Sequence, residues 1–163
     1  MPRAASAATR HWSESPEPVP QTFPDSPTTG RAPRCDDGRV AGSILVVDDD
    51  AAVRGLVVRI LRSWGHVVIG EAGSVAEALR CAATLHPDTV LVDIGLPDGD
   101  GFSLTRELRN RSRAPRVVIF SSDADRANVA AAERAGAVAF LPKDELSSPA
   151  LQRLLAGGAD GTG

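Results

Sequence analysis

Charged residues in this sequence come directly after three short apolar segments. Three carboxylates, Asp48, Asp49 and Asp50, follow ILVV, and a fourth, Asp93, follows TVLV. Lys143, the only lysine among eighteen basic residues, follows AFLP. Carboxylates held close together must bind a cation or take up protons, and a lysine ammonium binds phosphate as a point charge. These residue types are therefore suited to phosphoryl transfer, provided that the fold brings them together.

The segments between these positions alternate between two periodicities. Short apolar runs rich in β-branched residues, typical of buried strands, occupy residues 43–47, 66–70, 88–93, 116–120 and 137–141. Apolar residues at helical spacing occupy residues 51–65, 75–85, 102–110, 125–136 and 149–156. Five β-α repeats predict an α/β fold: a flavodoxin-like, doubly wound (βα)5 parallel sheet with strand order 2-1-3-4-5.

The expected domain covers residues 43–157, with a flexible C-terminus at residues 158–163. Seven of the twelve prolines lie in residues 1–42, which have no helical or strand period, so we expect a disordered N-terminal extension there. Whether that extension docks a partner, is inert or results from a misplaced start site stays open.

Composition excludes several classes of protein. The net charge of −3, without a run of basic residues, gives no electrostatic footprint for nucleic acid. No apolar stretch is long enough to span a membrane, and the N-terminus has no apolar signal segment. The two cysteines, Cys35 and Cys81, form no disulfide framework or metal-binding spacing. We expect a cytoplasmic protein.

The predicted sheet specifies where a site should lie. In doubly wound sheets, ligands bind beyond the carboxyl ends of the strands, beside the switch between strands 1 and 3. The carboxylates after these two strands should therefore converge. Oxygen ligands without a nearby histidine or cysteine favour a hard cation such as Mg²⁺. Ser121, at the end of strand 4, adds a hydroxyl, and Lys143 adds an ammonium at the end of strand 5.

With these features the sequence resembles the receiver domains of two-component response regulators, over about residues 43–156. The resemblance depends on VVDDD, VLVDIGLPDGDG, VVIFSSD and AFLPKD, which occur in the family's order. It implies that Asp93 accepts a phosphoryl group from a histidine kinase or phosphotransfer protein. It also implies that Asp48, Asp49, Asp93 and the backbone carbonyl of Gly95 bind Mg²⁺, with Asp48 acting largely through water.

The resemblance assigns roles to further residues. Ser121 and Lys143 would contact the phosphoryl oxygens, and Phe140 would be the switch aromatic that turns inward with Ser121. Gly95 and Asp123 would tune loss of the phosphoryl group.

The sequence departs from the family pattern after the lysine, where Asp144 replaces the frequent proline and Pro142 precedes. Only GGADGTG follows the last predicted helix, so we expect a stand-alone receiver with no DNA-binding domain, and no enzyme acting on an external substrate. Output would pass through protein contacts on the face of helix 4, strand 5 and helix 5, with a homodimer as one possibility.

Other interpretations of these residues stay open. Asp50 is the expected N-cap of the first helix, a role that could extend to its neighbours. Asp98, Asp100, Gly101 and Glu107 match part of a calcium-binding EF-hand loop, although Leu96 occupies its first ligand position. The rival functions are an aspartyl-phosphate hydrolase of the haloacid dehalogenase type, an FMN-binding flavodoxin-like module, and a scaffold receiver that is not phosphorylated.

Overall fold

The structure, a computed structural model, describes residues 42–157. The extension predicted for residues 1–42, apart from its last residue, and the flexible C-terminus predicted for residues 158–163 lie outside the described residues.

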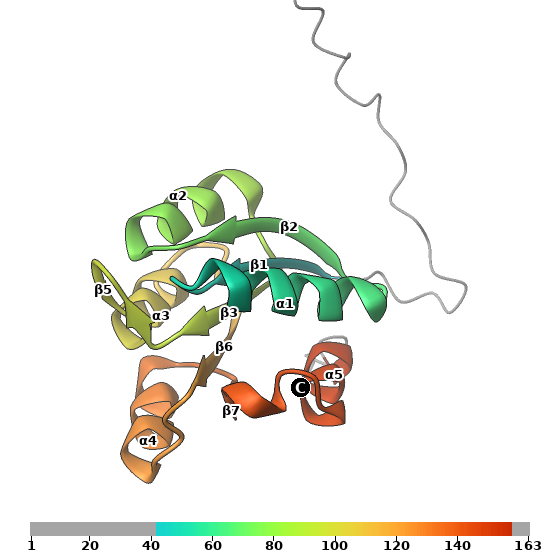
Figure 1. The fold of residues 1–163 in the computed structure, drawn as a ribbon. Helices are drawn as coiled ribbons and strands as arrows, with labels where there is room; N and C mark the ends of the chain where they lie inside the picture. Colours follow the sequence, from blue (N-terminus) through green and yellow to red (C-terminus); the bar gives the residue numbers. More distant parts are fainter. Residues whose placement is uncertain (1–41, 158–163) are drawn as a thin grey trace, which may run out of the picture. The chain divides into compact units, whose positions relative to one another are not determined.

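Five parallel strands form the main sheet (Figure 1). They are β1 (Ser43–Val47), β2 (Val67–Ala72), β3 (Thr89–Asp93), β6 (Arg116–Ser121) and β7 (Ala139–Pro142). Their order is β2-β1-β3-β6-β7. This is the predicted 2-1-3-4-5 order, counted over the strands of this sheet.

Five α-helices connect and cover the strands: α1 (Ala51–Ser63), α2 (Val75–Leu85), α3 (Gly101–Arg109), α4 (Arg126–Ala135) and α5 (Pro149–Ala156). Side-chain oxygens cap their first turns, which satisfies backbone donors that the helix cannot pair. The capping residues are Asp50, Ser74, Asp100, Asp125 and Ser148. These caps explain why each helix begins immediately after a polar residue.

Apolar side chains form one core on each face of the sheet. Leu45 and Val47 point to the core shared with α2, α3 and α4, whereas Ile44 and Val46 point to the core shared with α1 and α5. Figure 1 shows α2, α3 and α4 toward the left of the view, with α1 and α5 toward the right. Helices on both faces explain why the strands are almost continuously apolar.

The structure contains two short elements that the sequence did not predict. Strands β4 (Gly95–Leu96) and β5 (Gly99–Asp100) form an antiparallel hairpin between β3 and α3. A single 3₁₀ turn, η1 (Lys143–Glu145), follows β7. Each is too short to show a period, so neither can be read from an apolar pattern.

The last strand begins and ends later than residues 137–141. The Ala137 N–H donates to the carbonyl of Ala132, which completes the end of α4, and β7 then runs to Pro142. Lys143 consequently begins η1. A proline fits at the end of β7 because this strand is at the edge of the sheet, where its missing donor breaks no ladder.

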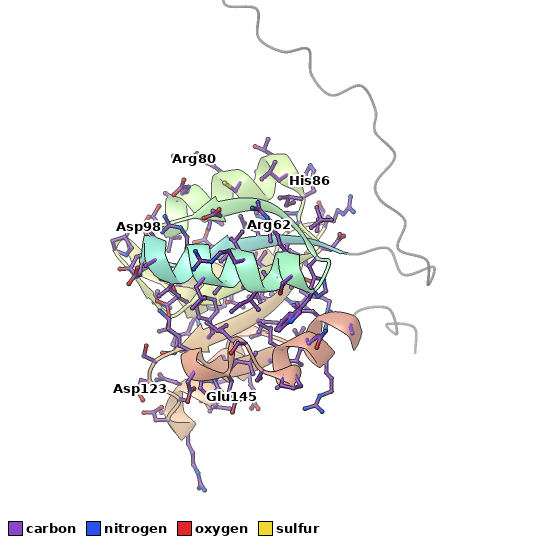
Figure 2. All side chains as sticks on the ribbon, turned by 45° about the vertical axis from the view of Figure 1, so that its right-hand side comes forward. Arg62, Arg80, His86, Asp98, Asp123 and Glu145 are labelled. Atoms are coloured by element: carbon purple, nitrogen blue, oxygen red, sulfur yellow. The ribbon has the colours of Figure 1, made fainter. Side chains whose placement is uncertain are left out.

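Strand register brings the carboxyl ends of the central strands to one edge. Val47 is level with Val92, Asp93 with Phe120, and Ser121 with Pro142. In Figure 2, the labelled residues Asp98 and Asp123 lie at the left of the view and His86 lies toward the right. The loops after β3 and β6 therefore share one end of the domain.

Candidate phosphorylation and metal-binding site

The three consecutive aspartates after β1 have different environments. Asp48 is fully buried, whereas Asp49 and Asp50 are exposed. The Asp48 N–H donates to the carbonyl of Ala72 at the end of β2 (3.1 Å), and Asp48 Oδ1 accepts from the Asp50 N–H (2.8 Å). Asp50 Oδ1 accepts from the Ala52 N–H (2.8 Å), so the expectation that Asp50 caps α1 is confirmed.

Asp93 closes β3 beside Asp48 and Asp49, the acidic pair of this site. Its side chain is buried, and carboxylate oxygens of Asp48, Asp49 and Asp93 lie within 4.8 Å of one another. These three aspartates form the one group of three or more potential metal ligands found among residues 42–157. The predicted convergence of the carboxylates after strands 1 and 3 is therefore present.

Lys143 is the cation that faces these carboxylates. Its Nζ lies 2.8 Å from Asp48 Oδ2 and 3.3 Å from Asp93 Oδ1. It also lies 5.6 Å from the centre of the Phe120 ring. Partial burial alone would lower the pKa of Lys143, but contact with Asp48 and the charge of Asp93 raise it above its usual value. The ammonium is consequently held charged between the two buried carboxylates.

One ammonium does not satisfy three carboxylates. Burial raises the pKa of Asp93 above its usual value, and the charge of Asp48 adds to this effect although Lys143 opposes it. Asp48 Oδ2 is buried and accepts no hydrogen bond of good geometry from residues 42–157, so its contact with Lys143 is an ion pair. A buried, incompletely satisfied oxygen within an all-oxygen donor set fits Mg²⁺. Asp48, Asp49 and Asp93 are the side chains that could hold it.

Gly95 lies next to the Asp93 carboxylate. A β-carbon built on Gly95 would lie 3.5 Å from Asp93 Oδ2, and Gly95 is exposed. The residue predicted to offer its carbonyl to the metal is therefore adjacent to Asp93, and its lack of a side chain leaves the space beside Asp93 Oδ2 unfilled.

Ser121 ends β6, the neighbour of β3, and is buried. Its Oγ accepts from the Asp123 N–H (3.1 Å). Asp123 itself is exposed. Ser122, Ala124, Pro142 and Asp144 join Lys143 in lining an open surface depression of about 540 Å³ on this side of the site.

Phe140 occupies the middle of β7, level with Ile119. It is partly buried and packs against the core shared with α2, α3 and α4. This placement accounts for its apolar character, and the switch role remains a prediction.

The acidic turn after β3 does not form a calcium loop. The two carboxylate oxygens of Asp98 accept from the N–H groups of Val75 (2.7 Å) and Ala76 (2.9 Å) at the start of α2. These N–H groups hold the pKa of Asp98 below its usual value. Asp100 instead caps α3 through the Ser103 N–H (2.8 Å). The two carboxylates therefore bind amides of different helices and fix the hairpin that carries Gly95.

Gly101, the first residue of α3, fixes the backbone beside Asp93, a role that was not predicted from the sequence. Its N–H donates to the carbonyl of Ile94 (2.9 Å), the residue directly after Asp93. A β-carbon at Gly101 would collide with the Asp93 carbonyl oxygen and lie 3.0 Å from Ile94 Cα. In the sequence, a glycine directly after Asp100 indicates only a turn. Its close contact with the backbone of Asp93 is visible only in the folded structure.

Comparison with known proteins identifies the family. The profile of the response regulator receiver domain matches residues 44–155. This chain therefore belongs to the response regulator receiver family, in which phosphorylation of an aspartate and binding of Mg²⁺ are general. Within residues 42–157, none of the helices has the length and apolar character needed to cross a bilayer.

Three proteins illustrate the similarity. The chain is 34% identical over 107 residues to the transcriptional regulatory protein PdtaR of Mycobacterium tuberculosis, covering 66% of this chain and 52% of that protein. It resembles the receiver domain of the putative response regulator NarL from M. tuberculosis, with TM-score 0.65, 33% identity and coverage of 71% of this chain and 97% of that one. It also resembles the CheX-CheY-BeF3-Mg²⁺ complex from Borrelia burgdorferi, with TM-score 0.65, 25% identity and coverage of 71% and 87%. The chain thus spans about half the length of PdtaR.

We expect Gly101→Ala to destabilise the protein by about 1–3 kcal/mol, because the new methyl group must displace the backbone of Asp93 and Ile94. Gly55→Ala is the matched control. Nothing lies within 4 Å of its added β-carbon, in the middle of α1, so it should stabilise by about 0.5–1 kcal/mol. Urea unfolding measures both, and wild-type stability in Gly101→Ala would contradict the close contact.

Proposed function

We propose that Asp93 accepts a phosphoryl group from a histidine kinase or phosphotransfer protein in a Mg²⁺-dependent reaction. The observation that carries this proposal is the position of Asp93: its carboxylate lies within 4.8 Å of the acidic pair and 3.3 Å from Lys143. A nucleophile flanked by ligands for a hard cation and by a fixed ammonium suits phosphoryl transfer, which depends on positioning and charge stabilisation.

Each residue of the site has a part in this reaction. Asp93 attacks the phosphorus, the bond from phosphorus to the donor nitrogen breaks, and an acyl phosphate forms. Asp48, Asp49, Asp93 and the Gly95 carbonyl would hold Mg²⁺, which would reduce the repulsion between the attacking carboxylate and the phosphoryl oxygens. Lys143 pairs with one phosphoryl oxygen, and the Ser121 hydroxyl donates to another.

Phosphorylation would redistribute the contacts of Lys143. In the unmodified protein its shorter contact is with Asp48, at 2.8 Å against 3.3 Å for Asp93. A phosphoryl group brings about −1.5 to −2 charges and strong acceptor oxygens, so it should attract both Lys143 and Ser121. Phe140 on β7 would turn inward with Ser121 and convey the change to α4, β7 and α5.

We propose that the output is a protein contact rather than a reaction on an external substrate. The chain would act in the cytoplasm as a stand-alone receiver, with α4, β7 and α5 as the face that meets a downstream protein or a second copy. Because PdtaR is about twice as long as the matched region, its regulatory activity is not transferred to this chain.

Intact-mass measurement after incubation with acetyl phosphate and Mg²⁺ tests the acceptor. We expect transient addition of one phosphoryl group to the wild type and none to Asp93→Asn. Chelation of Mg²⁺ should also prevent labelling. Equal labelling of Asp93→Asn, or none of the wild type, would contradict the proposal. Steady turnover of an external phosphoester would instead support a phosphohydrolase.

Gly95→Arg should slow loss of the phosphoryl group severalfold, because a side chain at this position begins 3.5 Å from Asp93 Oδ2 and would obstruct water. Gly157→Arg adds the same charge where nothing lies within 4 Å, so it is the control and should leave the rate unchanged. The decay of the labelled mass after removal of acetyl phosphate gives both rates. Equal rates in the two variants would count against Gly95 as a tuning residue, and Asp123→Ala extends the test to the second tuning position.

A further inference from the structure

Arg54, in the second turn of α1, makes contacts that neither capping nor surface exposure explains. Its Nη1 donates to two carbonyl oxygens, that of Asp48 (2.6 Å) and that of Asp49 (3.3 Å). Only 20% of its side chain is exposed. A guanidinium is therefore directed at the backbone of the two residues that form the acidic pair.

These carbonyls lie where the chain has no regular structure to hold it. β1 ends at Val47 and α1 begins at Ala51, so the Asp48 and Asp49 carbonyls belong to neither the sheet ladder nor the helix. The Asp48 N–H is fixed by Ala72 and one carboxylate oxygen by the Asp50 N–H. Arg54 fixes the remaining backbone group of Asp48, its carbonyl. Together these bonds restrict the rotation of this peptide segment and the direction of its carboxylates.

The guanidinium is itself confined. Its Nε lies 3.8 Å from Glu71 Oε2 on β2, and this Nε is buried without a hydrogen-bond partner in residues 42–157. Gly73 leaves it space, because a β-carbon there would lie 3.3 Å from Nη1. β2, the glycine after it and α1 therefore hold Arg54 in one place.

Arg54 and Lys143 use their charges differently. Lys143 contacts carboxylate oxygens that a metal would also use, whereas the hydrogen bonds of Arg54 go to carbonyl oxygens. We infer that Arg54 is a positioning residue for the Mg²⁺ site: it preorganises the Asp48–Asp49 segment without occupying its carboxylates. This inference rests on the proposed function, since it concerns the same metal site.

A positioning role and simple charge repulsion predict opposite changes in Mg²⁺ affinity when Arg54 is removed. Removing a nearby positive charge should by itself strengthen cation binding. Loss of a residue that orients metal ligands typically weakens binding 10–100-fold. The sign of the change in affinity therefore separates the two effects.

Isothermal titration of Mg²⁺ into the full chain, without a phosphoryl donor, tests the inference. We expect Arg54→Ala to raise the Kd about tenfold. Arg59→Ala is the matched control, since it removes the same charge from an exposed position on the same helix and should change the Kd by less than about twofold. An unchanged or lower Kd for Arg54→Ala, or an equal rise in both variants, would overturn the positioning role.

Thermal unfolding without Mg²⁺ checks that each variant is folded. If Arg54→Ala does not fold, Arg54→Lys carries the test: it keeps the charge but lacks the Nη1 that donates to both carbonyls, so weaker Mg²⁺ binding supports the role and wild-type affinity overturns it. Wild-type binding separates this inference from the proposed function. If the wild type binds Mg²⁺ and the Arg54 variants bind it with the same affinity, only the Arg54 role fails, whereas a wild type without affinity overturns the site and this role together.

Discussion

Repulsion among three carboxylates at one edge of the sheet is the constraint that organises this protein. Asp48 and Asp93 are buried, and Asp49 brings a third carboxylate within 4.8 Å. Lys143 offsets part of their charge, through an ion pair of 2.8 Å with Asp48 and one of 3.3 Å with Asp93. The remaining negative charge suits the site to a divalent cation, beside which the proposed function places a phosphoryl group.

The fold maintains this unfavourable cluster by fixing the backbone on which it stands. The Ala72 carbonyl accepts from the Asp48 N–H, and Arg54 donates to the carbonyls of Asp48 and Asp49. Asp98 ties the hairpin after Asp93 to the start of α2, while Gly101 brings α3 against the Asp93 carbonyl. The stability of the two apolar cores and of these loop contacts compensates for the charge repulsion among the three carboxylates.

Much of this organisation could be predicted because it depends on long-range regularities. The alternation of strands with helices predicted the sheet order, and the sheet order predicted that Asp48, Asp49 and Asp93 converge. The roles of Arg54 and Gly101 could not be predicted in this way. An arginine on a helix and a glycine after an aspartate have ordinary local explanations, and their importance depends on carbonyl groups that only the folded backbone places beside them. The short β4–β5 hairpin escaped prediction because two-residue strands have no period.

Thermal unfolding of the wild type and of Asp49→Ala, each with and without Mg²⁺, tests the central claim most directly. Without Mg²⁺, the variant should be at least as stable as the wild type, because it loses a repelling carboxylate whose side chain is exposed. Mg²⁺ at about 100 times its Kd should stabilise the wild type by about 2.7 kcal/mol and leave the variant nearly unchanged. Equal stabilisation of both proteins, or of neither, would contradict the claim that these carboxylates are held together to bind a cation.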